Sequence, residues 1–83
     1  MKIQVLGTGC AKCKKLYAET EKAVAASGMA VELEKVENMA EIMKFRVMMT
    51  PALVVDGEVK ASGRIPATSE IVSWIMTSAA KNG

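Results

Sequence analysis

The pattern of apolar and polar positions predicts a strand followed by a long helix in the first third of the chain. A short apolar run over residues 2–6 ends at a glycine, which is typical of a buried strand. The segment from Ala11 to Ser27 lacks glycine and proline and is rich in alanine, lysine and glutamate, so we expect a helix there, ended by Gly28. Its less polar side chains recur at helical spacing: Cys13, Leu16, Thr20, Ala23 and Val24.

The middle of the chain predicts a second strand and a short second helix. Apolar and charged residues alternate over 31–36, which indicates a strand with one exposed face. Asn38, three residues before Glu41, resembles a capping box at the start of a helix. The apolar positions of that helix are Met39, Ile42, Met43 and Phe45.

The last third predicts a hairpin and a final helix. Asp56-Gly57 separates two β-prone runs, 52–55 and 58–61, and this dipeptide is among the strongest short hairpin signals. Pro66 suits the first turn of a helix, and Asn82-Gly83 forms its frayed end. The spacing of Ile71, Trp74, Ile75 and Ser78 indicates that this helix is amphipathic.

These elements predict one α/β domain over residues 1–83, in the order β-α-β-α-β-β-α. The first two strands should be parallel, because a right-handed βαβ crossover connects them. The hairpin should add antiparallel strands. We therefore expect a four-stranded mixed sheet flanked by three helices.

Composition excludes several classes of function. The 83 residues include no histidine, which removes the commonest general base and zinc ligand. A net charge of +2 and three aromatic residues do not favour nucleic-acid binding. We find no signal peptide and no apolar stretch long enough to span a membrane, and predict a cytoplasmic protein without a membrane partner.

Two cysteines carry the candidate chemistry. Cys10-Ala11-Lys12-Cys13 stands where a strand and a glycine turn lead into a helix. A thiolate at position 10 would be stabilised by the helix N-terminus, and the thiolate is the attacking form of cysteine. A C-x-x-C motif in this context indicates redox chemistry.

Lysines surround this motif at the start of the predicted helix. Lys12, Lys14 and Lys15 occupy the end of the helix that disfavours cations, and we expect their charge to lower the pKa of the Cys10 thiol. In the alternative interpretation, they form a solvated face that pairs partly with Glu19.

With Thr50-Pro51 before the third strand and a terminal helix after the hairpin, the chain resembles the thioredoxin/glutaredoxin superfamily, and within it the small thioredoxin-like redox-active disulfide proteins. The resemblance covers nearly the whole chain and implies a minimal thioredoxin-like fold. It implies that Cys10 is the nucleophile, Cys13 the resolving thiol and Pro51 a cis-proline facing their disulfide. Thr50 would offer its backbone to an extended substrate segment.

The resemblance also implies an activity and its partners. We expect a dithiol–disulfide oxidoreductase in electron transport and cell redox homeostasis, with no cofactor beyond the Cys10–Cys13 disulfide and no resident metal. Its partners would be disulfide-containing proteins and a reductase like that of thioredoxin, and the protein would be a monomer. Thioredoxins carry a buried acid six residues before the first cysteine, where this chain has Gln4. Proton transfer from Cys13 must then use water or another group.

Two other functions fit parts of the sequence. Cys10 and Cys13 resemble the paired thiolates of heavy-metal-associated copper chaperone domains and could carry Cu(I). The seven methionines could instead line a binding surface.

The methionines divide into two predicted groups. We expect Met39, Met43 and Met76 in the core, with Trp74 as a core anchor and Arg64 as a solvated loop charge. Met48 and Met49 flank Thr50-Pro51, and could form a hydrophobic rim around Cys10 together with Ile65.

Overall fold

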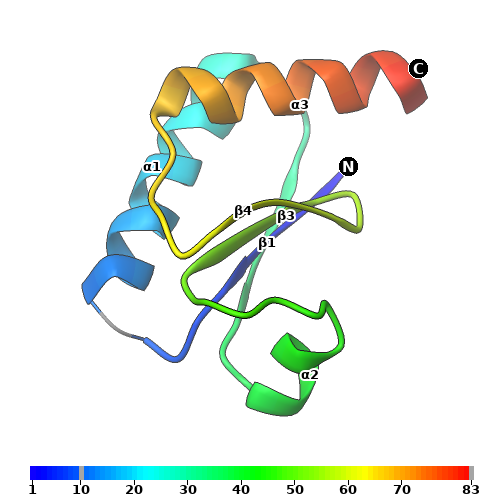
Figure 1. The fold of residues 1–83 in the computed structure, drawn as a ribbon. Helices are drawn as coiled ribbons and strands as arrows, with labels where there is room; N and C mark the ends of the chain where they lie inside the picture. Colours follow the sequence, from blue (N-terminus) through cyan, green and yellow to red (C-terminus); the bar gives the residue numbers. More distant parts are fainter. Residues whose placement is uncertain (10, 83) are drawn as a thin grey trace.

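The structure is a computed structural model that describes residues 1–9 and 11–82. Its elements follow the predicted order (Figure 1). They are β1 (Lys2–Leu6), α1 (Ala11–Ser27), β2 (Glu32–Val36), α2 (Met39–Met43), β3 (Ala52–Val55), β4 (Glu58–Ser62) and α3 (Thr68–Asn82).

The four strands form one mixed sheet in the order β2-β1-β3-β4. β1 and β2 are parallel, with Leu6 opposite Val36, while β1 pairs antiparallel with β3 and β3 with β4. The parallel pair is the one that the crossover through α1 requires, and the antiparallel edge comes from the hairpin.

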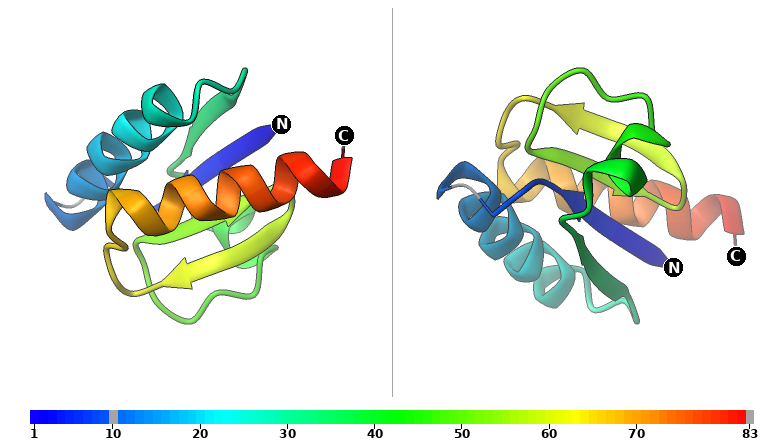
Figure 2. Two further views of the ribbon diagram at one scale, coloured as in Figure 1. Left: turned by 90° about the horizontal axis from the view of Figure 1, so that it is seen from above. Right: turned by 90° about the horizontal axis from the view of Figure 1, so that it is seen from below.

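Helices cover both faces of the sheet, as the two views of Figure 2 show: α1 and α3 lie on one face and α2 on the other. This arrangement follows from alternation along β1, since successive side chains point to opposite faces. The face toward α1 and α3 holds the larger core: Ile3, Val5, Leu16, Ala23, Leu53, Val55, Ala61, Ile71 and Ile75. The face toward α2 holds the smaller one: Leu6, Val36, Ile42, Ala52 and Val54.

Local sequence signals explain where the helices begin and end. Gly28 has a φ of 68°, the left-handed conformation that ends α1 without a Cβ clash. The Asn38 side chain accepts hydrogen bonds from the backbone N–H groups of Ala40 and Glu41, at 2.8 and 3.3 Å, and so caps α2. Within the described ranges, 1–9 and 11–82, no helix is long and apolar enough to cross a membrane.

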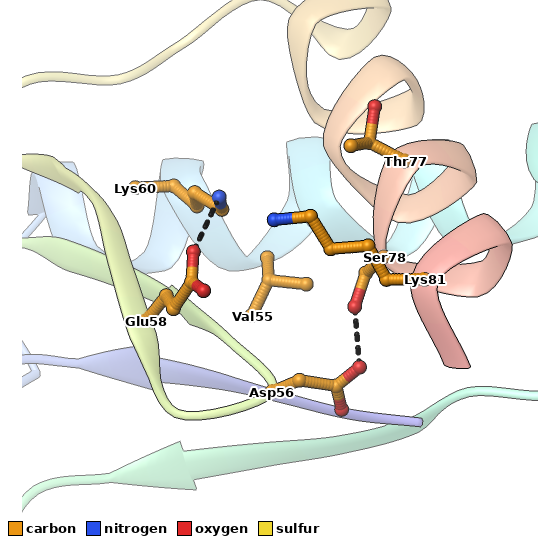
Figure 3. A pocket seen from close by; sticks show the side chains of 7 residues that line it. All are labelled: Val55, Asp56, Glu58, Lys60, Thr77, Ser78 and Lys81. Carbon is orange, nitrogen blue, oxygen red and sulfur yellow. Dashed lines mark hydrogen bonds and ion pairs between the residues drawn. The ribbon is translucent and has the colours of Figure 1, made fainter.

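The Asp56-Gly57 turn closes the predicted hairpin and attaches it to its neighbours. Both residues have positive φ, 47° and 85°, as the tight turn requires. The Asp56 carboxylate accepts hydrogen bonds from the Lys2 backbone N–H, at 2.9 Å, and from the Ser78 hydroxyl of α3. A hollow of about 90 Å³ lies between this turn and α3 (Figure 3). Its lining holds a Lys60–Glu58 ion pair at 2.9 Å and no residue of the predicted redox site.

Three methionines expected in the core are exposed, and that prediction was wrong. Met39, Met43 and Met76 are 55%, 69% and 49% exposed. α2 has only five residues, so it turns a single buried side chain, Ile42, toward the sheet. On α3, Ile75 faces the sheet, and the next residue, Met76, points about 100° away from it.

The segment before α3 differs in detail from the prediction. The helix begins at Thr68, two residues after Pro66. Arg64 is exposed, as expected of a solvated loop charge, and its guanidinium lies 3.3 Å from a Glu70 carboxylate oxygen and 6.0 Å from the centre of the Trp74 ring. Trp74 is half-buried and packs against the larger core, so it anchors α3 as expected.

Candidate active site

The candidate site lies where the carboxyl ends of β1 and β2 meet the first turn of α1. Leu6 and Val36 are opposite each other at the ends of the two parallel strands. The Gly7 N–H continues this pairing, donating to the Val36 carbonyl at 3.0 Å. Side chains after both strands are thereby brought to one edge of the sheet, which is where α/β proteins commonly bind ligands.

Cys13 is buried in this region. It lies in the first turn of α1, is 6% exposed, and its sulfur takes part in a disulfide. Cys10, the predicted nucleophile, lies outside the described residues.

Gly7 brings Cys13 and Pro51 close to one another. A Cβ atom placed on Gly7 would lie 2.3 Å from the Cys13 sulfur and 4.0 Å from the Pro51 Cα. Only a residue without a side chain allows so close an approach to the sulfur. Two of the predicted site residues, one in α1 and one directly before β3, therefore lie close to this glycine.

The Thr50–Pro51 segment directly precedes β3. Its peptide bond is cis, the isomer that the family resemblance implies. Pro51 is fully buried and its carbonyl accepts a hydrogen bond from the Gly63 N–H at 2.8 Å. Thr50 is exposed.

Met49 contacts the end of β4 and the glycine that follows it. The Ser62 hydroxyl donates to the Met49 carbonyl at 2.9 Å. The Met49 side chain covers Gly63, where an added Cβ would lie 2.9–3.1 Å from it. Met49 is 61% exposed, whereas Ile65 is half-buried and packs against the larger core.

The predicted lysines line one side of the first turn of α1. Lys12, Lys14 and Lys15 are exposed, and the first turn of the helix contains no acidic residue. Lys14 also lines a cavity next to Cys13, while Lys12 does not.

That cavity contains residues that the sequence analysis missed. It has a volume of about 70 Å³ and lies between α1 and the ends of β1 and β2. Its lining consists of Val5, Gly7, Gly9, Cys13, Lys14, Lys35 and Glu37. The available signal was that Glu37 directly follows β2, whose carboxyl end lies next to that of β1.

Two of these missed residues have defined surroundings. A Cβ on Gly9 would lie 3.3 Å from a Glu37 carboxylate oxygen, so that carboxylate lies against the turn between β1 and α1. The Lys35 ammonium lies 4.8 Å from the centre of the Tyr17 ring of α1, a cation–π contact.

Gln4 occupies a different environment. It follows Ile3 and precedes Val5, both of which face the α1 side, so its own side chain points to the opposite face. There its amide donates to the Glu34 carboxylate at 3.5 Å. Hydrogen bonds from Lys2 and then from Gln4 lower the pKa of Glu34. Gln4 does not line the cavity beside Cys13.

Comparisons with known proteins agree with this geometry. Two solved structures match 92% of the chain: thioredoxin-2, a component of malaria parasite protein secretion machinery, and a malarial protein. Their TM-scores are 0.70 and 0.67 at 18% and 19% identity, over 81% and 93% of those chains. These likenesses show the fold.

Sequence comparison finds relatives with higher sequence identity. The chain is 42% identical over 71 residues to a thioredoxin of Methanothermobacter thermautotrophicus, covering 86% of this chain and 92% of that protein. It is 38% identical over 69 residues to a thioredoxin of Methanocaldococcus jannaschii, covering 83% and 79%. A family model described as "Thioredoxin domain" matches residues 1–76. The chain therefore belongs to the thioredoxin domain family, a family of thiol–disulfide oxidoreductases.

Proposed function

We propose that the protein reduces disulfides in other proteins by exchange with the pair Cys10 and Cys13. The Cys10 thiolate attacks one sulfur of the substrate disulfide, and the other sulfur leaves as a thiolate. Cys13 then attacks the Cys10 sulfur of the mixed disulfide, which releases the second substrate thiolate and leaves a Cys10–Cys13 disulfide. Two electrons pass from the protein dithiol to the substrate.

The observation that carries this proposal is the position of Cys13. Its disulfide-bonded sulfur is buried in the first turn of α1 and lies against the same glycine as Pro51. A buried thiol one helical turn after an attacking thiol is suited to resolve a mixed disulfide, because the attacking thiol meets the substrate first.

The substrate-binding surface is proposed to run along Thr50 and Pro51. An extended substrate segment would pair with the exposed backbone at Thr50, as an added strand does. Met49 and Ile65 would supply apolar contacts beside it. Met49 suits this role because its side chain is flexible and largely exposed.

Activation of Cys10 is proposed to come from the helix N-terminus and from Lys12 and Lys14. Both lysines are exposed in the first turn of α1, where their charge can lower the pKa of a nearby thiol. A reductase like that of thioredoxin would return the disulfide to the dithiol. We further propose that the protein acts as a cytoplasmic monomer and that residues 1–83 form one domain.

Insulin reduction tests the proposal. The reduced protein should accelerate insulin precipitation by dithiothreitol, Cys10→Ser should abolish this activity, and Cys13→Ser should accumulate a mixed disulfide visible by mass spectrometry. Unchanged activity of Cys10→Ser would contradict the proposal. Tight Cu(I) binding by a protein without turnover would support the copper-carrier alternative instead.

A further inference from the structure

The buried Cys13 and the acidic residue Glu37 line the same cavity. Three charged side chains line it: Lys14 from α1, Lys35 from β2 and Glu37 from the residue after β2. The remaining walls are a valine and two glycines, which leave the space between these groups open. The Gly7 N–H donates to the Val36 carbonyl at 3.0 Å, which fixes the backbone directly before the exposed Glu37.

The inference rests on the proposed function, in which Cys13 must lose a proton before it attacks. The thiolate is the attacking form of cysteine, so the proton must leave the Cys13 sulfur before the new bond forms. Cys13 is only 6% exposed, so bulk water has little access to its sulfur and a proton acceptor inside the site would speed the step. Gln4 cannot be that base, since an amide does not titrate and its side chain is directed to the other face of the sheet.

The cavity is large enough for water to connect Cys13 with Glu37. Its volume of about 70 Å³ exceeds the roughly 10–15 Å³ that one water molecule needs. The Glu37 carboxylate lies against Gly9, which also lines the cavity, so this carboxylate can accept a hydrogen bond from such a water.

We propose that Glu37 accepts the proton of Cys13, through water in this cavity, during the resolving step. The S–H proton of Cys13 moves to water and from water to the Glu37 carboxylate. The resulting Cys13 thiolate attacks the Cys10 sulfur, and the electron pair of the broken mixed disulfide leaves with the substrate thiolate.

The other charged groups at the site act on the same thiolate. Lys14 and Lys35 line the cavity from α1 and β2, and their positive charge would favour a Cys13 thiolate. Lys12 and Lys15 add positive charge on the same turn of α1. The lining residues from β1 and from the turn after it, Val5, Gly7 and Gly9, carry no charge. Glu37 therefore supplies the carboxylate of this cavity lining.

A reaction with a chromogenic aryl disulfide separates the two steps. Reduced protein mixed with one equivalent of the reagent releases a first aryl thiolate when Cys10 attacks and a second when Cys13 resolves. The second phase is intramolecular, so its rate does not depend on reagent concentration. Stopped-flow absorbance would be recorded from about pH 5 to pH 9 for wild type, Glu37→Gln, Glu37→Asp and a matched control, Glu32→Gln, at the other end of β2.

Loss of the base should affect the second phase alone. At pH 7 we expect Glu37→Gln to slow that phase about tenfold or more, with the difference closing near pH 9, where hydroxide can take the proton. Glu37→Asp should recover part of the rate, and Glu32→Gln should match wild type in both phases.

Other results would overturn the inference, and they are distinguishable from failure of the proposed function. If Glu37 acts only through its charge, its neutralisation favours the thiolate and makes the second phase faster. An unchanged second phase, or equal slowing of both phases at every pH, also contradicts a proton-accepting role. If Cys10→Ser leaves the first phase intact, the proposed function itself fails.

Discussion

Gly7 and the sulfur of Cys13 are in such close contact that a methyl group on Gly7 would lie 2.3 Å from that sulfur. Real Cβ atoms essentially never approach a heavy atom so closely, so a side chain at position 7 must displace Cys13 or the strand end. Because of this contact, the packing of β1 against α1 should depend on whether the Cys13 sulfur is in a disulfide or is a thiol.

Gly7→Ala should therefore destabilise the oxidised protein more than the reduced one. A sulfur fixed in a disulfide cannot move away, whereas a free thiol can change rotamer. We expect a loss of about 1–3 kcal/mol in the free energy of unfolding of the oxidised form, measured by urea denaturation. Gly28→Ala is the control, because φ is 68° there but no atom lies within 4 Å, so both forms should lose the same amount. If Gly7→Ala lowers the free energy of unfolding equally in the oxidised and reduced forms, a clash with the disulfide sulfur is contradicted.

Ser62→Ala should weaken the action on protein substrates more than on small ones. The Ser62 hydroxyl donates to the Met49 carbonyl and so holds the Thr50–Pro51 segment against the end of β4. We expect a several-fold fall in kcat/KM for insulin and little change in the rate with a small aryl disulfide, which does not need an extended binding segment. Ser73→Ala, at an exposed position of α3, should change neither rate. A parallel loss on both substrates would assign Ser62 a general structural role.

Replacing Lys12 and Lys14 together by glutamine should raise the pKa of the Cys10 thiol. Each lost charge within about 8 Å changes the pKa by roughly 0.3–0.5 units in a largely aqueous environment. The alkylation rate of the reduced Cys13→Ser protein, followed against pH at low ionic strength, reports this pKa. Lys22→Gln, near the other end of α1, should leave it unchanged. If the pKa of the Cys10 thiol does not rise in the double variant, the interpretation of the lysines as a solvated face is favoured.

Glu19 should make stability depend on acid pH. A hydrogen bond from Thr68 of α3, and then one from Lys22, lowers the pKa of the Glu19 carboxyl in the folded state. Because the folded pKa lies below the unfolded value of about 4.3, the stabilisation is complete above about pH 5 and disappears as the pH falls through the folded pKa. Glu19→Gln should therefore lower Tm at pH 7 by a few degrees.

The same variant should have no effect on Tm near pH 2, where the wild-type carboxyl is also neutral. Glu21→Gln, an exposed neighbour on α1, serves as the control and should leave Tm unchanged at both pH values. An effect of Glu19→Gln that persists at pH 2 would mean that it arises from altered packing between α1 and α3.

Local signals in the sequence predicted most of the fold. The Asn38 cap, the left-handed Gly28 and the Asp56-Gly57 turn each act within a few residues, and each is found where expected. The exposure of Met39 and Met43 was not predictable in the same way, because it depends on α2 ending after five residues. Their helical spacing is compatible with either side of so short a helix.

The candidate site was only partly predictable for a related reason. Cys13 and Pro51 are conspicuous residue types, and a family resemblance assigned them roles before their contact through Gly7 was known. Glu37 and Lys35 are ordinary residues in a charged, exposed stretch of sequence. They become part of the site only because the parallel pairing of β1 with β2 places the ends of both strands beside α1.

A redox titration of the two thiols tests the central claim most directly. The protein would be equilibrated over a series of dithiothreitol ratios, alkylated under acid quench, and weighed by mass spectrometry. Dithiol–disulfide exchange by Cys10 and Cys13 predicts one two-electron transition in which both thiols become protected together, with a tenfold change in the equilibrium for about 30 mV. Independent alkylation of Cys10 and Cys13 at every ratio, with no intramolecular disulfide, would contradict it.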